Sequence, residues 1–172
     1  MFGFGKKKFS VEQAQDIIQG SILAYSTVRP EASYMWEKVL FKNEATLGCD
    51  DLKFVKVLVL LKSQIIFSAI AKNSDITIYV DIRERIMKWV TKTYEVEFDE
   101  DTKFSWFDKF KRSYAEKSDI NDLILSLGID FQLSITGGNY RVNNDALQAI
   151  CQSVGHHIYQ INKAIEKMKI IS

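Results

Sequence analysis

The sequence is poor in the residues that interrupt regular structure. Its 172 residues contain one proline and eight glycines, too few for the many tight turns of an all-β fold. It contains two cysteines, Cys49 and Cys151, whose separation matches neither a metal-ligand motif nor a redox motif. Because isolated cysteines of this kind are typical of a reducing compartment, we expect a cytoplasmic protein.

The sequence also lacks an excess of charge of either sign. It has 23 basic and 22 acidic residues, a net charge of +1, which removes the global electrostatic argument for binding nucleic acid or a membrane surface. Residues 1–9 combine phenylalanines with three lysines and are expected to form a flexible basic and aromatic tail. Three charges are too few for stable membrane anchoring without an acyl chain. The longest unbroken strongly apolar run, residues 57–61, is far shorter than a membrane span.

Apolar residues recur at helical intervals through most of the chain, of which 47% is hydrophobic. Ser10 and Gln13 have the spacing of a capping box, and Gly20 is placed for close approach of another helix. Pro30 suits the first position of the second helix. The pattern predicts helices over about 11–28, 30–43, 52–72, 75–93, 101–117, 119–128 and 145–168.

The third of these predicted helices is apolar around most of its circumference. A central, mostly buried position follows for it. Its polar residues form a narrow stripe that includes Lys53, Lys56, Ser63, Gln64 and Ser68. In the fourth helix Asp81 and Arg85 are spaced for an ion pair on the solvated face.

Two segments alternate between polar and apolar residues with a period of two. Residues 94–98 could form a short strand. Residues 129–135, followed by Gly137-Gly138, predict a small β-hairpin over 129–142 that rests on the helices or pairs with the first segment. The predicted fold is therefore mainly α: a single domain over residues 10–172, built as a bundle of six to seven helices with this hairpin.

No arrangement of residues points to metal or cofactor chemistry. His156 and His157 are adjacent, so on a helix their side chains point about 100° apart and cannot readily share one ion with Cys151. A partly buried His157 beside an exposed His156 is expected instead. The acidic residues between 95 and 101 lack the glycine and glutamate of a calcium loop. We predict no metal site, no cofactor and no catalytic residues.

Lys62 is the one candidate ligand-binding residue. On the third helix it points into an apolar sector formed by neighbours such as Leu58 and Ile66. Three interpretations stay open: the side chain extends to a bundle edge, it pairs with a buried carboxylate such as Asp16 or Glu84, or it faces a ligand pocket.

Three functional hypotheses follow, from different classes. The leading one is a non-catalytic helical interaction or regulatory module, whose partner is another protein or a second copy of the chain, because the sequence is rich in aromatic residues and has no catalytic motif. The second is a small-molecule-binding protein with a cavity between the third, fourth and last helices, where Lys62 meets an anionic group. The third is an enzyme without a recognisable motif that uses Lys62, His157 or a tyrosine.

Overall fold

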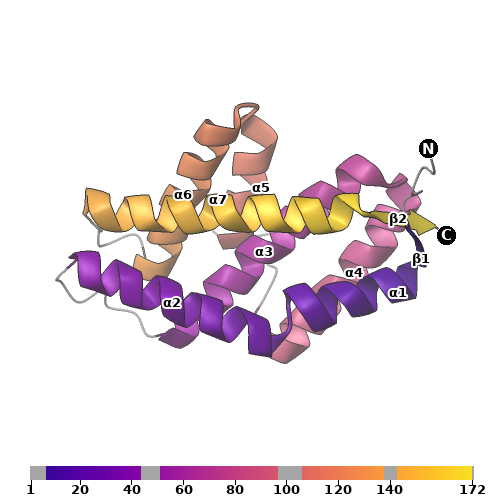
Figure 1. Ribbon diagram of the computed structural model, residues 1–172, viewed down its shortest axis with the longest axis horizontal. Helices are drawn as coiled ribbons and strands as arrows, with labels where there is room; N and C mark the ends of the chain where they lie inside the picture. The colour runs from indigo at the N-terminus through magenta and orange to yellow at the C-terminus, as the bar shows by residue number, and fades with distance from the viewer. Residues whose placement is uncertain (1–6, 44–50, 97–105, 138–142, 172) are drawn as a thin grey trace, which may run out of the picture.

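The computed structural model describes residues 7–43, 51–96, 106–137 and 143–171, and these form a mainly α-helical bundle (Figure 1). The fold class predicted from the sequence is confirmed. The elements in chain order are β1 (Lys7–Ser10), α1 (Val11–Ile17), the π-helix η1 (Ile18–Ile22), α2 (Tyr25–Asn43), α3 (Asp51–Asn73), α4 (Ile76–Tyr94), α5 (Trp106–Glu116), α6 (Ile120–Thr136), α7 (Asn144–Glu166) and β2 (Met168–Ile171).

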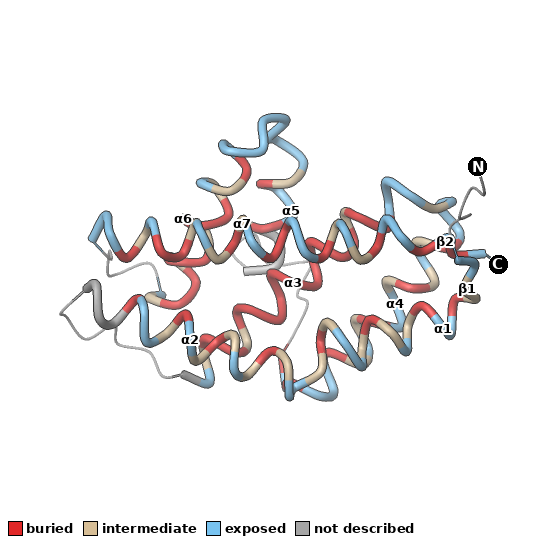
Figure 2. The backbone as a smooth tube through the Cα atoms, in the orientation of Figure 1, coloured by how far each residue is buried: buried red, intermediate tan, exposed pale blue. Residues whose placement is uncertain are grey.

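Helix α3 is the centre of the molecule, as predicted. It packs against α2, α4, α5, α6 and α7, and Figure 2 shows it buried along most of its length. Among the described residues, Leu52–Asn73 is the one helix long and apolar enough to cross a membrane, although its longest unbroken apolar run is short. In the protein, 83% of its most apolar window is buried, and the core helix of a bundle has the same composition.

The polar stripe of α3 does not face solvent throughout. Ser63 and Gln64 are buried, and their polar groups are satisfied locally: Ser63 Oγ donates to the Val59 carbonyl at 2.8 Å, and Gln64 Nε2 donates to Ser68 Oγ at 3.0 Å. Such bonds within one helix let polar side chains enter a core. The stripe is therefore buried at Ser63 and Gln64, whereas Lys53, Lys56 and Ser68 are partly exposed.

The predicted helix over 11–28 is broken at its middle. The π-helix η1 ends at Ile22, and the hydroxyl of Tyr94 donates a hydrogen bond to the Leu23 carbonyl at the break. Helix α2 then begins at Tyr25, so Pro30 lies inside it rather than at its first position. Pro30 is tolerated because it and Ser26, whose carbonyl it leaves without a helical donor, both lie on the exposed face. Gly20 is exposed with no atom within 4 Å of its Cβ direction, so the predicted close approach is wrong.

The predicted hairpin over 129–142 is also wrong where the structure describes it. Helix α6 continues to Thr136 and ends at Gly137, whose φ of 66° is the left-handed conformation that favours glycine. The apolar residues that are buried recur every four positions, and this helical period outweighs the alternation: Leu123, Leu127, Phe131 and Ile135. Residues 138–142 lie outside the described residues.

The predicted strand over 94–98 is absent at its start, and its end lies outside the described residues. Tyr94 is the last residue of α4, and Glu95 follows with a positive φ of 52°. Lys56 Nζ donates to the Glu95 carbonyl at 3.2 Å. A lysine that binds a carbonyl at a helix end compensates for one of the acceptors that the helix leaves unsatisfied.

A two-stranded parallel sheet joins the two ends of the described chain (Figure 1). Lys7 lies opposite Met168 and Ser10 opposite Ile171. Lys7 to Phe9, which the sequence placed in the tail, therefore form most of β1, and α7 ends at Glu166 rather than at 168. Each strand has four residues, too short a run for a period to show in the sequence.

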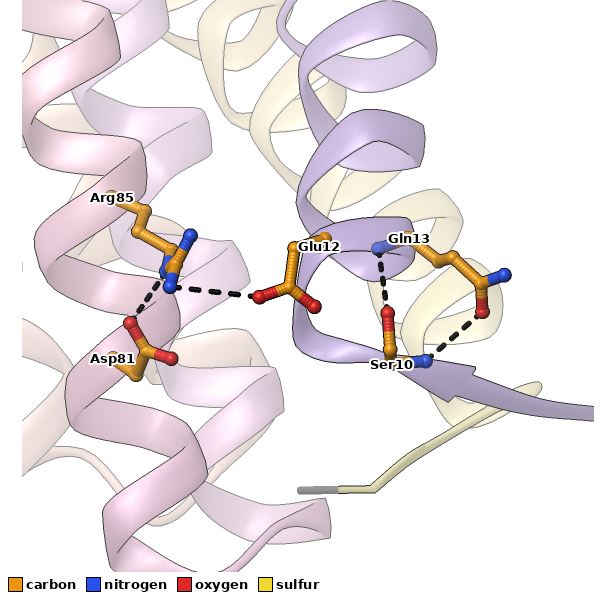
Figure 3. Close-up of polar contacts among 5 residues, drawn as sticks. All are labelled: Ser10, Glu12, Gln13, Asp81 and Arg85. Carbon is orange, nitrogen blue, oxygen red and sulfur yellow. Dashed lines mark hydrogen bonds and ion pairs between the residues drawn. The ribbon is translucent and has the colours of Figure 1, made fainter.

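Polar contacts hold the start of the first helix in place (Figure 3). Ser10 and Gln13 form the predicted capping box, with side-chain-to-backbone distances of 3.0 and 3.2 Å. Arg85 forms the predicted pair with Asp81 on α4, at 2.5 Å, and also contacts Glu12 of α1 at 3.6 Å. Arg85 thus links α4 to the start of α1.

Candidate functional site

Lys62 is buried within the bundle, and it is paired. Its side chain is 3% exposed, and its ammonium donates a hydrogen bond to Glu31 Oε2 at 2.5 Å, while the Glu31 side chain is 35% exposed. The prediction that Lys62 extends to a bundle edge is wrong. Pairing with a carboxylate is confirmed, but the partner comes from α2 and is neither Asp16 nor Glu84.

The environment of Lys62 acts on its pKa in two directions. Burial lowers the pKa of the ammonium, because a charge is poorly solvated in the interior. The hydrogen bond and the charge of Glu31 act in the opposite direction and are the smaller effect. Glu31 therefore only partly offsets the cost of placing this lysine in the core.

His157 of α7 is the second buried ionisable group of the site. It is 6% exposed, whereas His156 is exposed, as predicted. Burial, followed by the positive charge of Lys62 and then by His156, lowers the pKa of His157 to about 3. At neutral pH the imidazole is uncharged, so it carries one N–H donor and one acceptor nitrogen.

Helices α2 and α7 run side by side and enclose a groove of about 520 Å³ above these groups. The groove takes Glu31 and Lys38 from α2 and His157 from α7. It is lined by Glu31, Tyr34, Met35, Lys38, Ala149, Gln152, Ser153, His156 and His157. The cavity hypothesised from the sequence was placed between the third, fourth and last helices, whereas this groove lies between the second and the last. Lys62 does not line the groove itself but binds Glu31, which does.

The groove walls combine hydrogen-bonding groups with apolar surface. Lys38 Nζ lies 4.7 Å from the centre of the Tyr34 ring, a cation–π contact. The described residues give Lys38 no carboxylate partner. Gln152 and Ser153 add an amide and a hydroxyl from α7, and Met35 adds an apolar surface. This arrangement can hold a small molecule that has both a polar group and an apolar body.

The groove residues that α2 contributes were not predicted from the sequence. Glu31, Tyr34, Met35 and Lys38 are spaced three, four and seven apart, so they share one helix face. On α7 the corresponding signal is a run of small and polar residues, Ala149, Gln152, Ser153 and His156, at the same intervals. A groove forms there because these side chains are too small or too polar to fill the space between two helices.

A second polar cluster lies between α5 and α6. Ser113 Oγ donates to Asp130 Oδ2 at 2.5 Å and lies 2.9 Å from Ser126 Oγ. These groups satisfy one another, and Ser113 is buried. Among the described residues no group of three His, Cys, Asp or Glu side chains is placed to hold a metal ion. Burial raises the pKa of the Cys151 thiol, which makes it a poor nucleophile.

Comparisons with protein-family models, with curated proteins and with solved structures give no match for this chain.

Proposed function

We propose that this protein binds a small molecule in the groove between α2 and α7. The observation that carries the proposal is the groove volume of about 520 Å³ above a buried lysine and a buried histidine. Pockets for small ligands have volumes of roughly 300–1,000 Å³ and combine apolar walls with a few polar groups. Buried ionisable groups with shifted pKa values cluster at functional sites.

Native mass spectrometry of the purified protein tests this proposal. We expect a non-covalent adduct of a few hundred daltons on the parent protein, in line with the groove volume. Ser153→Phe fills the groove from α7 and should abolish the adduct. Gln160→Phe is the matched control, because Gln160 is exposed on the same helix and does not line the groove. A parent protein without any adduct, or an adduct that survives in Ser153→Phe, would contradict the proposal.

A second candidate function is self-association, within the interaction-module hypothesis. The observation that favours it is an apolar patch at the start of α4, where Ile76 is 72% and Val80 43% exposed. Ile171 at the end of β2 is 40% exposed and lines a shared hollow with Thr77. Ile76 and Val80 lie one turn apart on α4, and exposed apolar side chains on one helix face are typical of contact surfaces.

The mass of the protein in solution tests this candidate. We expect a concentration-dependent dimer by light scattering, and we expect Ile76→Asp to prevent it. Ile129→Asp is the control, since Ile129 is 40% exposed on α6, away from the patch. A monomer at a concentration of about 1 mM, or a dimer unaffected by Ile76→Asp, would exclude this use of the patch.

A further inference from the structure

We propose that the ligand of the groove is a small organic anion, whose carboxylate or phosphate group replaces Glu31 as the partner of Lys62. This inference rests on the proposed function and names its ligand class. In the unliganded protein, Glu31 would then act as an internal substitute for the ligand.

Lys62 and Glu31 differ in how far their side chains are exposed. Lys62 is 3% exposed and Glu31 35% exposed, so the carboxylate can turn into water while the ammonium cannot. A buried ammonium needs a negative partner, because the low dielectric constant around it makes an unpaired charge costly. An anion that enters the groove can supply that partner with no change in the charge beside Lys62.

The groove and Lys62 offer hydrogen-bond donors to such an anion. Lys62 Nζ has three N–H groups, and Glu31 is the one acceptor that the described residues give it. Lys38, Gln152 and Ser153 provide further donors along the walls. Glu31 is the one acidic residue among the described residues that line the groove, so its rotation toward solvent removes the only nearby repulsion.

The charges around the groove favour an anionic ligand over a cationic one. A cationic ligand would have to compete with Lys62 for Glu31 and would lie close to Lys38. Like charges at such distances are unfavourable, especially where water is excluded. The ring of Tyr34 and the side chain of Met35 provide surface for a planar or apolar body. An aromatic carboxylate matches both parts of the groove.

Three probes of nearly equal shape test the charge preference: benzoate, benzamide and benzamidine. By isothermal titration calorimetry we expect benzoate to bind about tenfold or more tightly than benzamide, and benzamidine to bind most weakly. Lys62→Met should remove the preference for benzoate over benzamide. Lys163→Met is the control of equal charge, because Lys163 is exposed on α7 outside the groove, and it should keep the preference.

A second variant tests the exchange itself. Glu31→Gln leaves Lys62 without its carboxylate, so benzoate should raise the melting temperature of this variant more than that of the parent. Inorganic phosphate is a second probe of the same variant. If the site accepts phosphate, phosphate raises the melting temperature of Glu31→Gln as benzoate does. If the site is specific for carboxylates, only benzoate raises it. Both results support the exchange of anions at Lys62.

Failure of this inference differs from failure of the proposed function. If benzamide or benzamidine binds as tightly as benzoate, and Ser153→Phe abolishes this binding, the anion inference is overturned but the groove remains a ligand site. An equal effect of benzoate on Glu31→Gln and on the parent would overturn the exchange with Glu31. If no probe binds and the parent carries no adduct, the proposed function fails as well.

Discussion

At the scale of single residues, the most informative feature is the buried lysine, Lys62. Lys62 lies on the central helix, where its neighbours Leu61 and Ile66 are fully buried. A charge in this position is not needed for stability, because a well-packed apolar residue of similar volume usually serves as well or better. The pair of Lys62 with Glu31 is therefore better explained by a function of the groove than by the needs of the fold.

Removal of the two partners of this pair should have unequal effects. Glu31→Gln leaves a buried ammonium without a counter-charge and should cost roughly 2–4 kcal/mol of unfolding free energy. Lys62→Met keeps the apolar stem and releases Glu31 to water, so its effect should stay within about 1 kcal/mol. Urea denaturation of both variants measures the difference. Equal losses would mean that Glu31 is as dependent on the pair as Lys62 is.

The depressed pKa of His157 predicts a pH dependence with a definite sign. An unfolded histidine binds a proton below about pH 6.5, while His157 in the folded protein does so only near a pKa of about 3. The unfolded state therefore gains protons first, and stability falls as the pH decreases through this window. Between pH 7 and 4.5 the loss from this one group should be roughly 3 kcal/mol.

Denaturation curves at several pH values check this prediction. His157→Gln should remove this part of the pH dependence, whereas His156→Gln, on the exposed neighbour, should retain it. If the parent protein is equally stable at pH 7 and pH 4.5, the pKa of His157 is not lowered in the folded protein.

At the scale of residues, the sequence predicts burial better than it predicts partners. The apolar neighbours of Lys62 left open whether its ammonium lies in the interior or at a bundle edge, and the structure places it in the interior. The expected contrast between a more buried His157 and an exposed His156 is confirmed. The partner Glu31 could not be predicted, because it is 31 positions away and the contact depends on how α2 lies against α3. Such a contact leaves no periodic signal in the sequence.

At the scale of elements, α6 and α7 approach each other closely at two glycines. A Cβ atom on Gly128 would lie 2.5 Å from Cys151 Sγ and 3.6 Å from Cys151 Cα, and one on Gly155 would lie 3.1 Å from Ile124 Cδ1. The distances of 2.5 and 3.1 Å to the two side chains are short enough that these side chains would have to move. The absence of a side chain at both positions therefore sets how closely the two helices pack.

Gly128→Ala should therefore destabilise the protein by about 1–3 kcal/mol, even though alanine favours a helix. Cys151→Ala in the same chain removes the Sγ atom in the way and should recover part of the loss. Gly20→Ala is the control, because no atom lies within 4 Å of its Cβ position, and it should be neutral or mildly stabilising. Thermal unfolding measures all three. A harmless Gly128→Ala would mean that the helices separate at little cost.

The elements that the sequence predicts well are those with one strong period. Helices α4 and α7 begin and end within a few residues of their predicted bounds, because their buried residues follow one continuous stripe. The hairpin was predicted wrongly because residues 129–135 satisfy both periods. The glycine that ends the helix was also misplaced: Gly137 caps α6, and Gly128 serves packing instead.

At the scale of the whole molecule, the parallel strands hold the two ends of the described chain together. Ile170 is 8% exposed and lies opposite Phe9. Neither strand could be predicted from the sequence, because each is stabilised by the other from the far end of the chain. Such pairing closes a long loop, whose entropic cost must be offset by contacts like that of Ile170.

Truncation of Ile170 should weaken both ends together. Ile170→Ala should cost about 2 kcal/mol and increase amide exchange at Lys8 to Ser10. Lys169→Ala is the control, because Lys169 is the exposed neighbour of Ile170. It should leave amide exchange at Lys8 to Ser10 unchanged. Hydrogen–deuterium exchange of the two variants checks the link. Exchange in β1 that does not respond to Ile170→Ala would show that the strand is held by α1 alone.

The central claim about the whole molecule is that the α2–α7 groove above Lys62 and Glu31 is a binding site for a small anion. An amide NMR titration of the parent protein with benzoate tests it most directly, because it locates the ligand without a mutation. We expect saturable shifts concentrated at Glu31, Lys38, Ser153 and His157. Shifts that are absent, or that gather away from this groove, would contradict it.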